Sequence, residues 1–248
     1  MRRRRRLGGP IVVVGLVVLL ALRCAGRAPD PDTSATPPTT PGRAGSTAAT
    51  APPALAARDP LDARSLLARL VIDDGIPPGG YRRDGWPTWE DIDHDGCDAR
   101  EQALIAASRT PADRAPNCRV LSGSWVSAYD GVEVVGPPQG IEVDHLVPLK
   151  NAYVSGGDEW SVDRRVLFAN DPSELWAVSS ASNGSKGDRA PDDWRPPQRS
   201  TWCEYATRWV AIKVRWELTA TTSERDALGE MLDTCAAGGA PTSAERAG

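Results

Sequence analysis

An aspartate followed directly by a histidine, Asp144 and His145, interrupts the apolar segment EVDHLVPL at 142–149. Further along, SNGSKGD supplies Asn183 and Lys186. Histidine is a general base near neutral pH, and Asp and Asn oxygens suit hard ions such as Mg²⁺ or Mn²⁺. These types predict metal-assisted phosphodiester hydrolysis, with His145 activating water, Asp144 and Asn183 as metal ligands, and Lys186 stabilising the extra negative charge.

The elements that must position these residues follow from apolar patterns. Residues 140–150 are predicted to form a strand that Pro148 ends, and 174–179 a second strand. A helical or irregular crossover joins the two, and a short helix or turn then carries Asn183 and Lys186. Because neighbouring side chains of a strand face opposite ways, the chain must twist or leave the sheet near His145 if Asp144 is to share its site.

The flanking segments predict an α+β fold. Helical periodicity recurs in four segments, 61–72, 97–109, 202–219 and 223–235. Residues 118–131 alternate in polarity and end in Asp-Gly, which predicts a strand entering a hairpin. Near the last helix, Ser223 and Asp226 resemble a capping box. The tryptophans that recur every seven residues at 202, 209 and 216 are interpreted as core rather than as a platform for stacked bases.

The N-terminal quarter has a different composition. Five arginines and the twelve-residue apolar run at 11–22 predict a signal peptide over 1–26, or an uncleaved anchor, because a membrane span needs about 20 residues. Residues 27–57 are rich in Pro, Ala and Thr, which predicts a disordered linker. A nuclease-like domain is expected over 58–240, and a disordered tail over 241–248. We therefore expect a secreted or extracellular protein, tethered to the membrane only if the N-terminal segment is retained.

Four cysteines lie within the predicted domain, Cys97, Cys118, Cys203 and Cys235. In an exported domain they imply two disulfides, with three possible connectivities. Pairing Cys97 with Cys118 and Cys203 with Cys235 is favoured because each pair brackets one predicted helical unit. A four-cysteine zinc site is the weaker alternative, since the sequence has no C-x-x-C spacing.

Charge argues against nucleic-acid binding through overall positive potential. The net charge is -4, and residues 1–26 hold six arginines and no acid, so the remainder is more acidic still. Lysine and arginine are nevertheless concentrated between 186 and 216, which predicts a local basic face. Lys186 and Arg189 are candidate phosphate contacts. Arg100 is either a third contact or a salt-bridged residue on a helix surface.

A second acidic motif precedes the predicted helix at 97–109. Asp91, Asp93 and Asp95, followed by Gly96, imitate the start of a calcium loop. The twelfth position of such a loop needs a bidentate glutamate, and here it is Gln102. A solvated acidic turn is the favoured interpretation, and a structural Ca²⁺ site is the alternative.

Several longer segments carry a resemblance to a known family: EVDHLVPLKNAYVSGG, FANDPSELWAVSSASNGSKGDRAPDDWRPP, CEYATRWVAIKVRWEL, GCDAR and CRVLSGSW. Together, from about Tyr81 to Cys235, they closely resemble secreted HNH-type endonuclease proteins with a GmrSD-type C-terminal domain, in the His-Me finger superfamily. That domain is shared with the DNA-cleaving subunit of modification-dependent restriction enzymes. The resemblance implies a ββα-metal core, with His145 as general base and Asp144 and Asn183 as metal ligands.

One position departs from the family pattern. HNH proteins usually carry an asparagine just before the leucine of the second strand, where it holds the loop of the catalytic base. Here that residue is Glu174. Either Asn170 takes the role, or Glu174 accepts the same backbone hydrogen bond, or the site is less well organised than in active relatives.

Two function classes remain in view. The first is a metal-dependent, monomeric endonuclease for DNA, with RNA as a further substrate and low sequence specificity, because no recognition module accompanies the core. The second is a surface binding protein on a catalytically weak or inactive nuclease fold. A buried structural histidine would suit the second class, but the company of Asn183 and Lys186 favours a catalytic His145.

Overall fold

The computed structural model describes residues 60–235. The segments predicted as leader, linker and tail, 1–26, 27–57 and 241–248, lie outside the described residues. None of the helices within 60–235 is long and apolar enough to cross a membrane.

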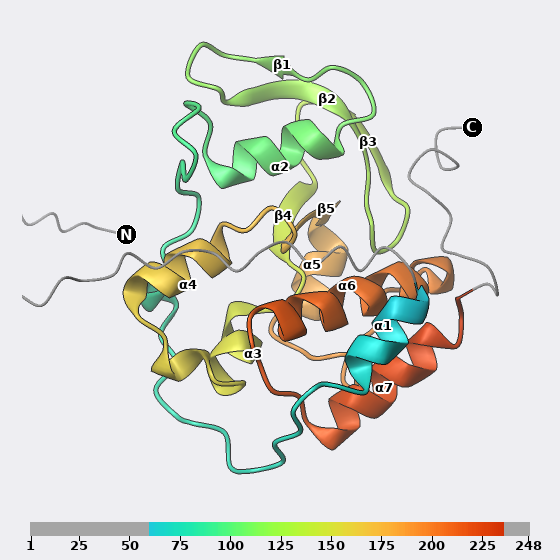
Figure 1. Ribbon diagram of the computed structural model, residues 1–248. Helices are drawn as coiled ribbons and strands as arrows, with labels where there is room; N and C mark the ends of the chain where they lie inside the picture. The colour runs from blue at the N-terminus through green and yellow to red at the C-terminus, as the bar shows by residue number, and fades with distance from the viewer. Residues whose placement is uncertain (1–59, 236–248) are drawn as a thin grey trace, which may run out of the picture. The chain divides into compact units, whose positions relative to one another are not determined.

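A strand–strand–helix unit lies at the centre of the described chain (Figure 1). Strand β4 (Ile141–His145) pairs antiparallel with β5 (Leu175–Ser179), and helix α5 (Ser180–Lys186) follows β5 without a loop. The Ser179 side chain accepts a hydrogen bond from the backbone N–H of Ser182 and so caps α5. Every residue of β5 is buried, because one face of the strand packs in a cluster with α2 (Ala99–Ala107) and the other face packs in the main core cluster. The predicted ββα order is confirmed.

The crossover between β4 and β5 is helical. Pro148 precedes α3 (Leu149–Val154) at its N-cap position, and α3 is followed by the 3-10 helix η2 (Gly157–Glu159) and by α4 (Val162–Ala169). Gly156 links α3 to η2 with a φ of 110°, a left-handed conformation that glycine adopts at little cost. The crossover therefore brings the end of α4 back to the end of β4.

A second, small sheet covers one side of this unit. Strand β2 (Val120–Val126) lies between β1 (Asp113–Arg114) and β3 (Glu133–Gly136), and the predicted hairpin joins β2 to β3. Helix α2 packs against β2 and begins at Asp98, whose side chain accepts from the backbone N–H of Glu101. The predicted disulfide Cys97–Cys118 is present and ties the start of α2 to the start of β2.

Three helices make a layer on the other side. Helices α1 (Pro60–Leu67), α6 (Trp202–Arg215) and α7 (Thr222–Leu232) contact one another, and the 3-10 helix η3 (Arg199–Thr201) leads into α6 (Figure 1). The second predicted disulfide, Cys203–Cys235, is present and joins the first turn of α6 to the segment that follows α7. Trp209 and Trp216 are fully buried in the main core cluster and Trp202 packs, partly buried, against that cluster, so the tryptophan series belongs to the core.

Some local predictions were wrong. The strand predicted over 140–150 ends at His145, and the helix predicted over 202–219 ends at Arg215. The first helix ends at Leu67 rather than at 72, since Ile72 instead forms an isolated bridge with Ala220. Helix α7 is capped by Thr221, whose hydroxyl accepts from the backbone N–H of Glu224. The predicted capping residue Ser223 lies inside the helix, where its hydroxyl donates to Asp192 at 2.7 Å.

Candidate active site

Asp144 and His145 are the last two residues of β4. They pair with Trp176 and Leu175 of β5, so the strand stays in the sheet through His145 and leaves it only afterwards. In a regular strand two neighbouring side chains face opposite ways. The predicted twist or departure from the sheet at His145 is therefore wrong, and Asp144 and His145 make separate contacts on the two faces of β4, both at its carboxyl end.

His145 is buried and held in one orientation. Its Nε2 lies 2.8 Å from the carbonyl oxygen of Ala169, at the end of α4. A carbonyl only accepts, so Nε2 carries the ring proton and Nδ1 of the neutral ring keeps its lone pair. Burial lowers the pKa of His145 to about 4, with smaller opposing effects from Ala169 and Asp144 and smaller lowering effects from Arg83 and Lys186. The ring is therefore neutral at neutral pH.

Trp89 covers the imidazole of His145. The two rings stack with centroids 5.6 Å apart and an interplanar angle of 30°. Trp89 has a φ of 64°, a left-handed conformation that is uncommon for a bulky residue. Asn170 holds the same segment, because its Oδ1 accepts from the backbone N–H of Glu90 at 2.9 Å and its Nδ2 donates to the carbonyl of Pro87 at 3.0 Å. Asn170 thus fixes the cover over His145.

Glu174 holds the segment that follows His145. Its side chain is fully buried, and Oε2 accepts from the backbone N–H of Val147 at 2.9 Å. Its main-chain carbonyl accepts from Leu146 at 2.8 Å. Among the described residues Oε1 has no hydrogen-bond partner, and burial raises the pKa of this carboxyl well above its ordinary value, which favours the protonated form. Of the three interpretations left open by the sequence, this geometry corresponds to the one in which Glu174 accepts the backbone hydrogen bond.

Asp144 lies on the α5 side of β4. Its Oδ2 accepts from the hydroxyl of Tyr129 at 2.7 Å and from Nζ of Lys186 at 2.7 Å, and the Asp144 side chain is 12% exposed. Lys186 also donates to the carbonyl of His145 at 2.9 Å, and its side chain is fully buried. This burial does not fit the predicted contact of Lys186 with phosphate. The ammonium instead fixes Asp144 and the end of β4.

Asn183 lies one helical turn before Lys186 and also faces β4. Its Nδ2 donates to Oε2 of Glu142 at 2.6 Å. Glu142 is exposed and stands two residues before Asp144, hence on the same face of the strand. The structure therefore brings Asn183 and Lys186 to the face of β4 that carries Asp144. Glu142 was not among the predicted site residues. The two-residue period of a strand nevertheless predicts that its side chain lies on the same face as that of Asp144.

The two other predicted basic contacts differ in their surroundings. Arg100 forms an ion pair with the neighbouring Glu101, whose Oε2 accepts from the backbone N–H of Val120 at 2.5 Å. This is the salt-bridged alternative for Arg100. The guanidinium of Arg189 donates to the carbonyls of Ser185 and Lys186 at the end of α5, and this residue is exposed. Arg189 is therefore the predicted contact that remains accessible beside the site.

The acidic motif forms a compact turn between Trp89 and helix α2. Carboxylate oxygens of Asp91, Asp93 and Asp95 lie within 4.8 Å of one another. Asp91 accepts from the backbone N–H groups of Asp95 and Gly96, and Gln102 donates to Asp93 at 2.9 Å. Backbone and side-chain donors thus already offset part of the negative charge of these carboxylates. A structural Ca²⁺ site stays a prediction.

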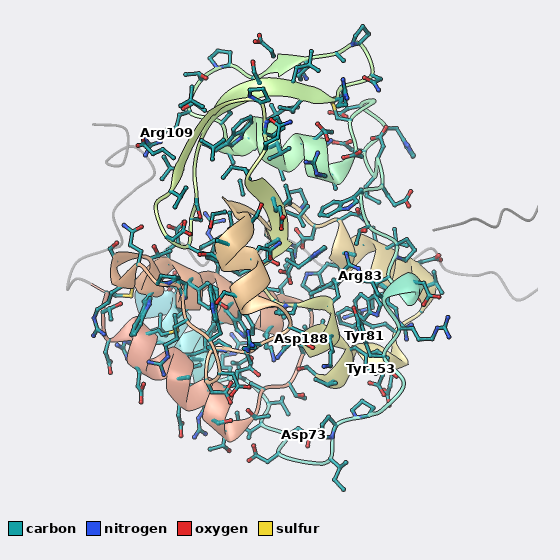
Figure 2. The ribbon with its side chains drawn as sticks, turned by 180° about the vertical axis from the view of Figure 1, so that it is seen from behind. Asp73, Tyr81, Arg83, Arg109, Tyr153 and Asp188 are labelled. Carbon is teal, nitrogen blue, oxygen red and sulfur yellow. A yellow bond between two sulfur atoms is a disulfide. The ribbon has the colours of Figure 1, made fainter. Side chains whose placement is uncertain are left out.

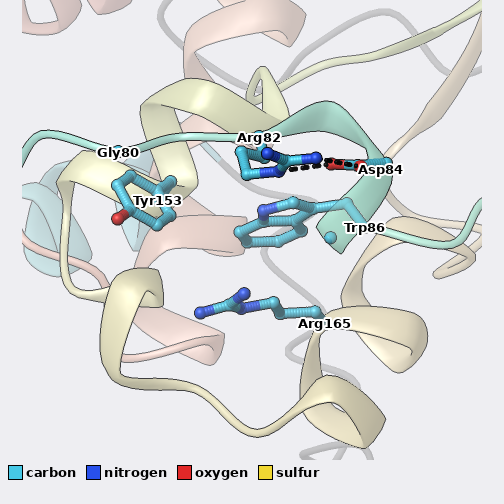
Figure 3. Close-up of a pocket in the computed structure, with 7 residues that line it drawn as sticks. Gly80, Arg82, Asp84, Trp86, Tyr153 and Arg165 are labelled. Carbon is cyan, nitrogen blue, oxygen red and sulfur yellow. Dashed lines mark hydrogen bonds and ion pairs between the residues drawn. The ribbon is translucent and has the colours of Figure 1, made fainter.

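A hollow of about 330 Å³ lies beside the 3-10 helix η1 (Arg83–Gly85) (Figure 3). The charged side chains that line this hollow already bind other groups of the protein. Arg82 binds Asp84 at 2.7 Å, and the guanidinium of Arg165 stacks on Trp86 at 5.5 Å while donating to backbone carbonyls of η2. None of the predicted catalytic residues lines this hollow. Arg83 is exposed on η1 (Figure 2).

Comparison with known proteins identifies the family. The sequence pattern of the C-terminal domain of GmrSD restriction endonucleases matches residues 98–231, more than half of the chain, including β4, β5 and α5. The chain belongs to this family. The resemblance drawn from the Asp-His and Asn-x-x-Lys motifs is thereby confirmed, and the GmrSD-type domain indicates a nuclease-like function.

The chain is also similar to a curated fungal protein. An uncharacterised secreted protein of Arthroderma benhamiae is 39% identical to the GmrSD-type chain over 175 residues, which are 70% of this chain and 84% of the relative. No solved structure matches the chain.

Proposed function

We propose that this GmrSD-type protein is a secreted, metal-dependent endonuclease that hydrolyses phosphodiester bonds of DNA, with His145 activating water. The observation that carries the proposal is the hydrogen bond from Nε2 of His145 to the carbonyl of Ala169. It leaves Nδ1 as the basic atom, on a ring that burial keeps neutral. Nδ1 takes a proton from the attacking water, and the carbonyl of Ala169 stabilises the imidazolium that forms.

Three contacts hold the base in place. Trp89 packs against the ring, Glu174 fixes the backbone at Val147, and Lys186 binds the carbonyl of His145 itself. The Lys186 ammonium donates both to the carbonyl of His145 and to the carboxylate of Asp144, so one buried cation connects the base to a candidate metal ligand. Preorganisation of this kind lowers the cost of orienting the base when substrate binds.

The residues around Asp144 fit a hard divalent cation. Within residues 60–235, no hydrogen bond uses Oδ1 of Asp144 or Oδ1 of Asn183, so both side chains offer an oxygen. Oxygen donors are the ligands that Mg²⁺ and Mn²⁺ prefer. A divalent cation held there would neutralise charge on the phosphate and on the leaving oxygen.

The class of substrate and the location rest on the family and on the disulfides. The matched domain is one of restriction endonucleases, which favours DNA as substrate. The described residues add to the ββα unit a small sheet and helices that pack on it, so we expect low sequence preference. Two disulfides are typical of an oxidising compartment, and the fungal relative is described as secreted.

A second candidate function is a binding protein on a weakly active nuclease fold. The observation that favours it is the burial of His145, which is 6% exposed beneath Trp89. In that case the site binds nucleic acid but turns over slowly.

The test is cleavage of supercoiled plasmid by the whole chain, purified with both disulfides formed. We expect nicking in Mg²⁺ or Mn²⁺ that EDTA abolishes and that Asp144→Asn weakens, since the variant removes a charged oxygen ligand. If folded protein cleaves neither DNA nor RNA in any divalent ion but still retains nucleic acid on a gel, the binding function is correct and the enzyme is not.

A further inference from the structure

Helix α5 meets β4 through two side-chain contacts one helical turn apart. Asn183 donates to Glu142 at 2.6 Å, and Lys186 donates to Asp144 at 2.7 Å. Residues three apart share a helix face, and residues two apart share a strand face. The pairing therefore sets Asn183 and Asp144 on facing surfaces, with Glu142 next to both.

The amide of Asn183 has two unlike ends. Its NH₂ donates, and its Oδ1 alone can bind a cation. The donor end is taken by Oε2 of Glu142, so Oδ1 is turned away from Glu142, and no hydrogen bond within residues 60–235 uses it. An ionised carboxylate only accepts, so Glu142 selects the NH₂ end and excludes the flipped amide.

We propose that Glu142 is a positioning residue that fixes the amide of Asn183 with its oxygen available to a divalent cation. The inference rests on the proposed function, because it concerns the same site. Partners that orient a metal ligand in this way affect cation affinity without touching the ion. The exposed position of Glu142 on the strand leaves its substitution compatible with folding.

The experiment measures Mn²⁺ affinity by the loss of the electron paramagnetic resonance signal of the free ion, with the whole chain and no substrate. We expect Glu142→Ala to weaken binding by about 10- to 100-fold, the usual effect of removing such a partner. Glu142→Gln keeps an acceptor for the Asn183 amide but can also donate to its oxygen, so we expect a measurable loss of affinity that is smaller than the loss in Glu142→Ala. The control is Glu133→Ala, which removes another exposed strand glutamate, one that lies on β3 beside Arg109.

Two outcomes overturn the proposal while the metal site stands. If Glu142→Ala binds Mn²⁺ as the unaltered protein does, Glu142 orients nothing. If Glu142→Gln binds as weakly as Glu142→Ala, the carboxylate itself is a ligand rather than a positioning group. If the unaltered protein binds no Mn²⁺ at all, the proposed metal-dependent function fails and this inference fails with it.

Discussion

Glu174 Oε2 accepts the backbone N–H of Val147 at 2.9 Å, two residues beyond the histidine that ends β4. Val147 and Glu174 are both buried, and this contact, together with the hydrogen bond from the Leu146 N–H to the Glu174 carbonyl, fixes how the chain leaves the sheet after His145. A protonated glutamic acid has an acceptor oxygen and so resembles an asparagine amide at this position. The departure from the family pattern thereby retains the hydrogen bond.

We expect Glu174→Ala to lower the free energy of unfolding by about 1–3 kcal/mol, because it leaves a buried N–H of Val147 without a partner. Glu174→Gln keeps the acceptor and should be as stable as the unaltered protein or more so at pH 8. The raised pKa means that the folded state keeps a proton that the unfolded chain releases above about 4.5, so this carboxyl costs stability as pH rises. Chemical denaturation at pH 5 and pH 8 checks both variants. Equal stability of the alanine and glutamine variants would contradict the account.

The His145 ring should titrate near pH 4 in the metal-free folded protein. As pH falls from about 6.5 to about 4, the unfolded chain takes up a proton that the folded ring does not, and about 3 kcal/mol of stability is lost from this group. His145→Gln should lack this part of the acid sensitivity. Ring chemical shifts in a nuclear magnetic resonance titration measure the pKa directly, and a midpoint near 6.5 would show that the ring is not desolvated.

Lys186 and Lys150 provide a matched pair of ion-pair tests. Lys186 is fully buried against Asp144, whereas the side chains of Lys150 and its partner Asp188 are each 52% exposed. We expect Lys186→Met to cost about 3–5 kcal/mol, since it leaves a mostly buried carboxylate without its cation. Lys150→Met should cost about 0–1 kcal/mol, as exposed pairs do. Thermal unfolding of both variants at low salt makes the comparison, and similar losses would contradict a buried, structural role for Lys186.

Much of the fold was predictable because its signals are local. Pro148 lies at the N-cap of α3 just after the strand that carries His145, Asp98 caps α2, and Asp130 with Gly131 marks the β2–β3 hairpin. Each of these effects acts within a few residues of the chain. The disulfide pairs were predictable because each joins cysteines that are consecutive in the predicted domain, 21 and 32 residues apart.

The contacts that organise the site were not predictable, because each joins segments far apart in sequence. Trp89 reaches His145, and Lys186 reaches Asp144, only through tertiary packing. The burial of Lys186 is of this kind, since nothing in SNGSKGD distinguishes a lysine that meets solvent from one that meets a carboxylate. Glu142 is the exception, because its place two residues before Asp144 follows from strand periodicity alone.

The central claim is that His145 is the general base, and the chain offers its own control in the other histidine. His94 lies exposed in the acidic turn with a φ of 59°, a conformation that asparagine tolerates. The decisive measurement is the rate of plasmid nicking in Mn²⁺ by the unaltered chain, His145→Ala and His94→Asn. We predict a loss of about 10²- to 10⁴-fold for His145→Ala and an unchanged rate for His94→Asn. Nicking by folded His145→Ala at the rate of the unaltered chain would contradict the account.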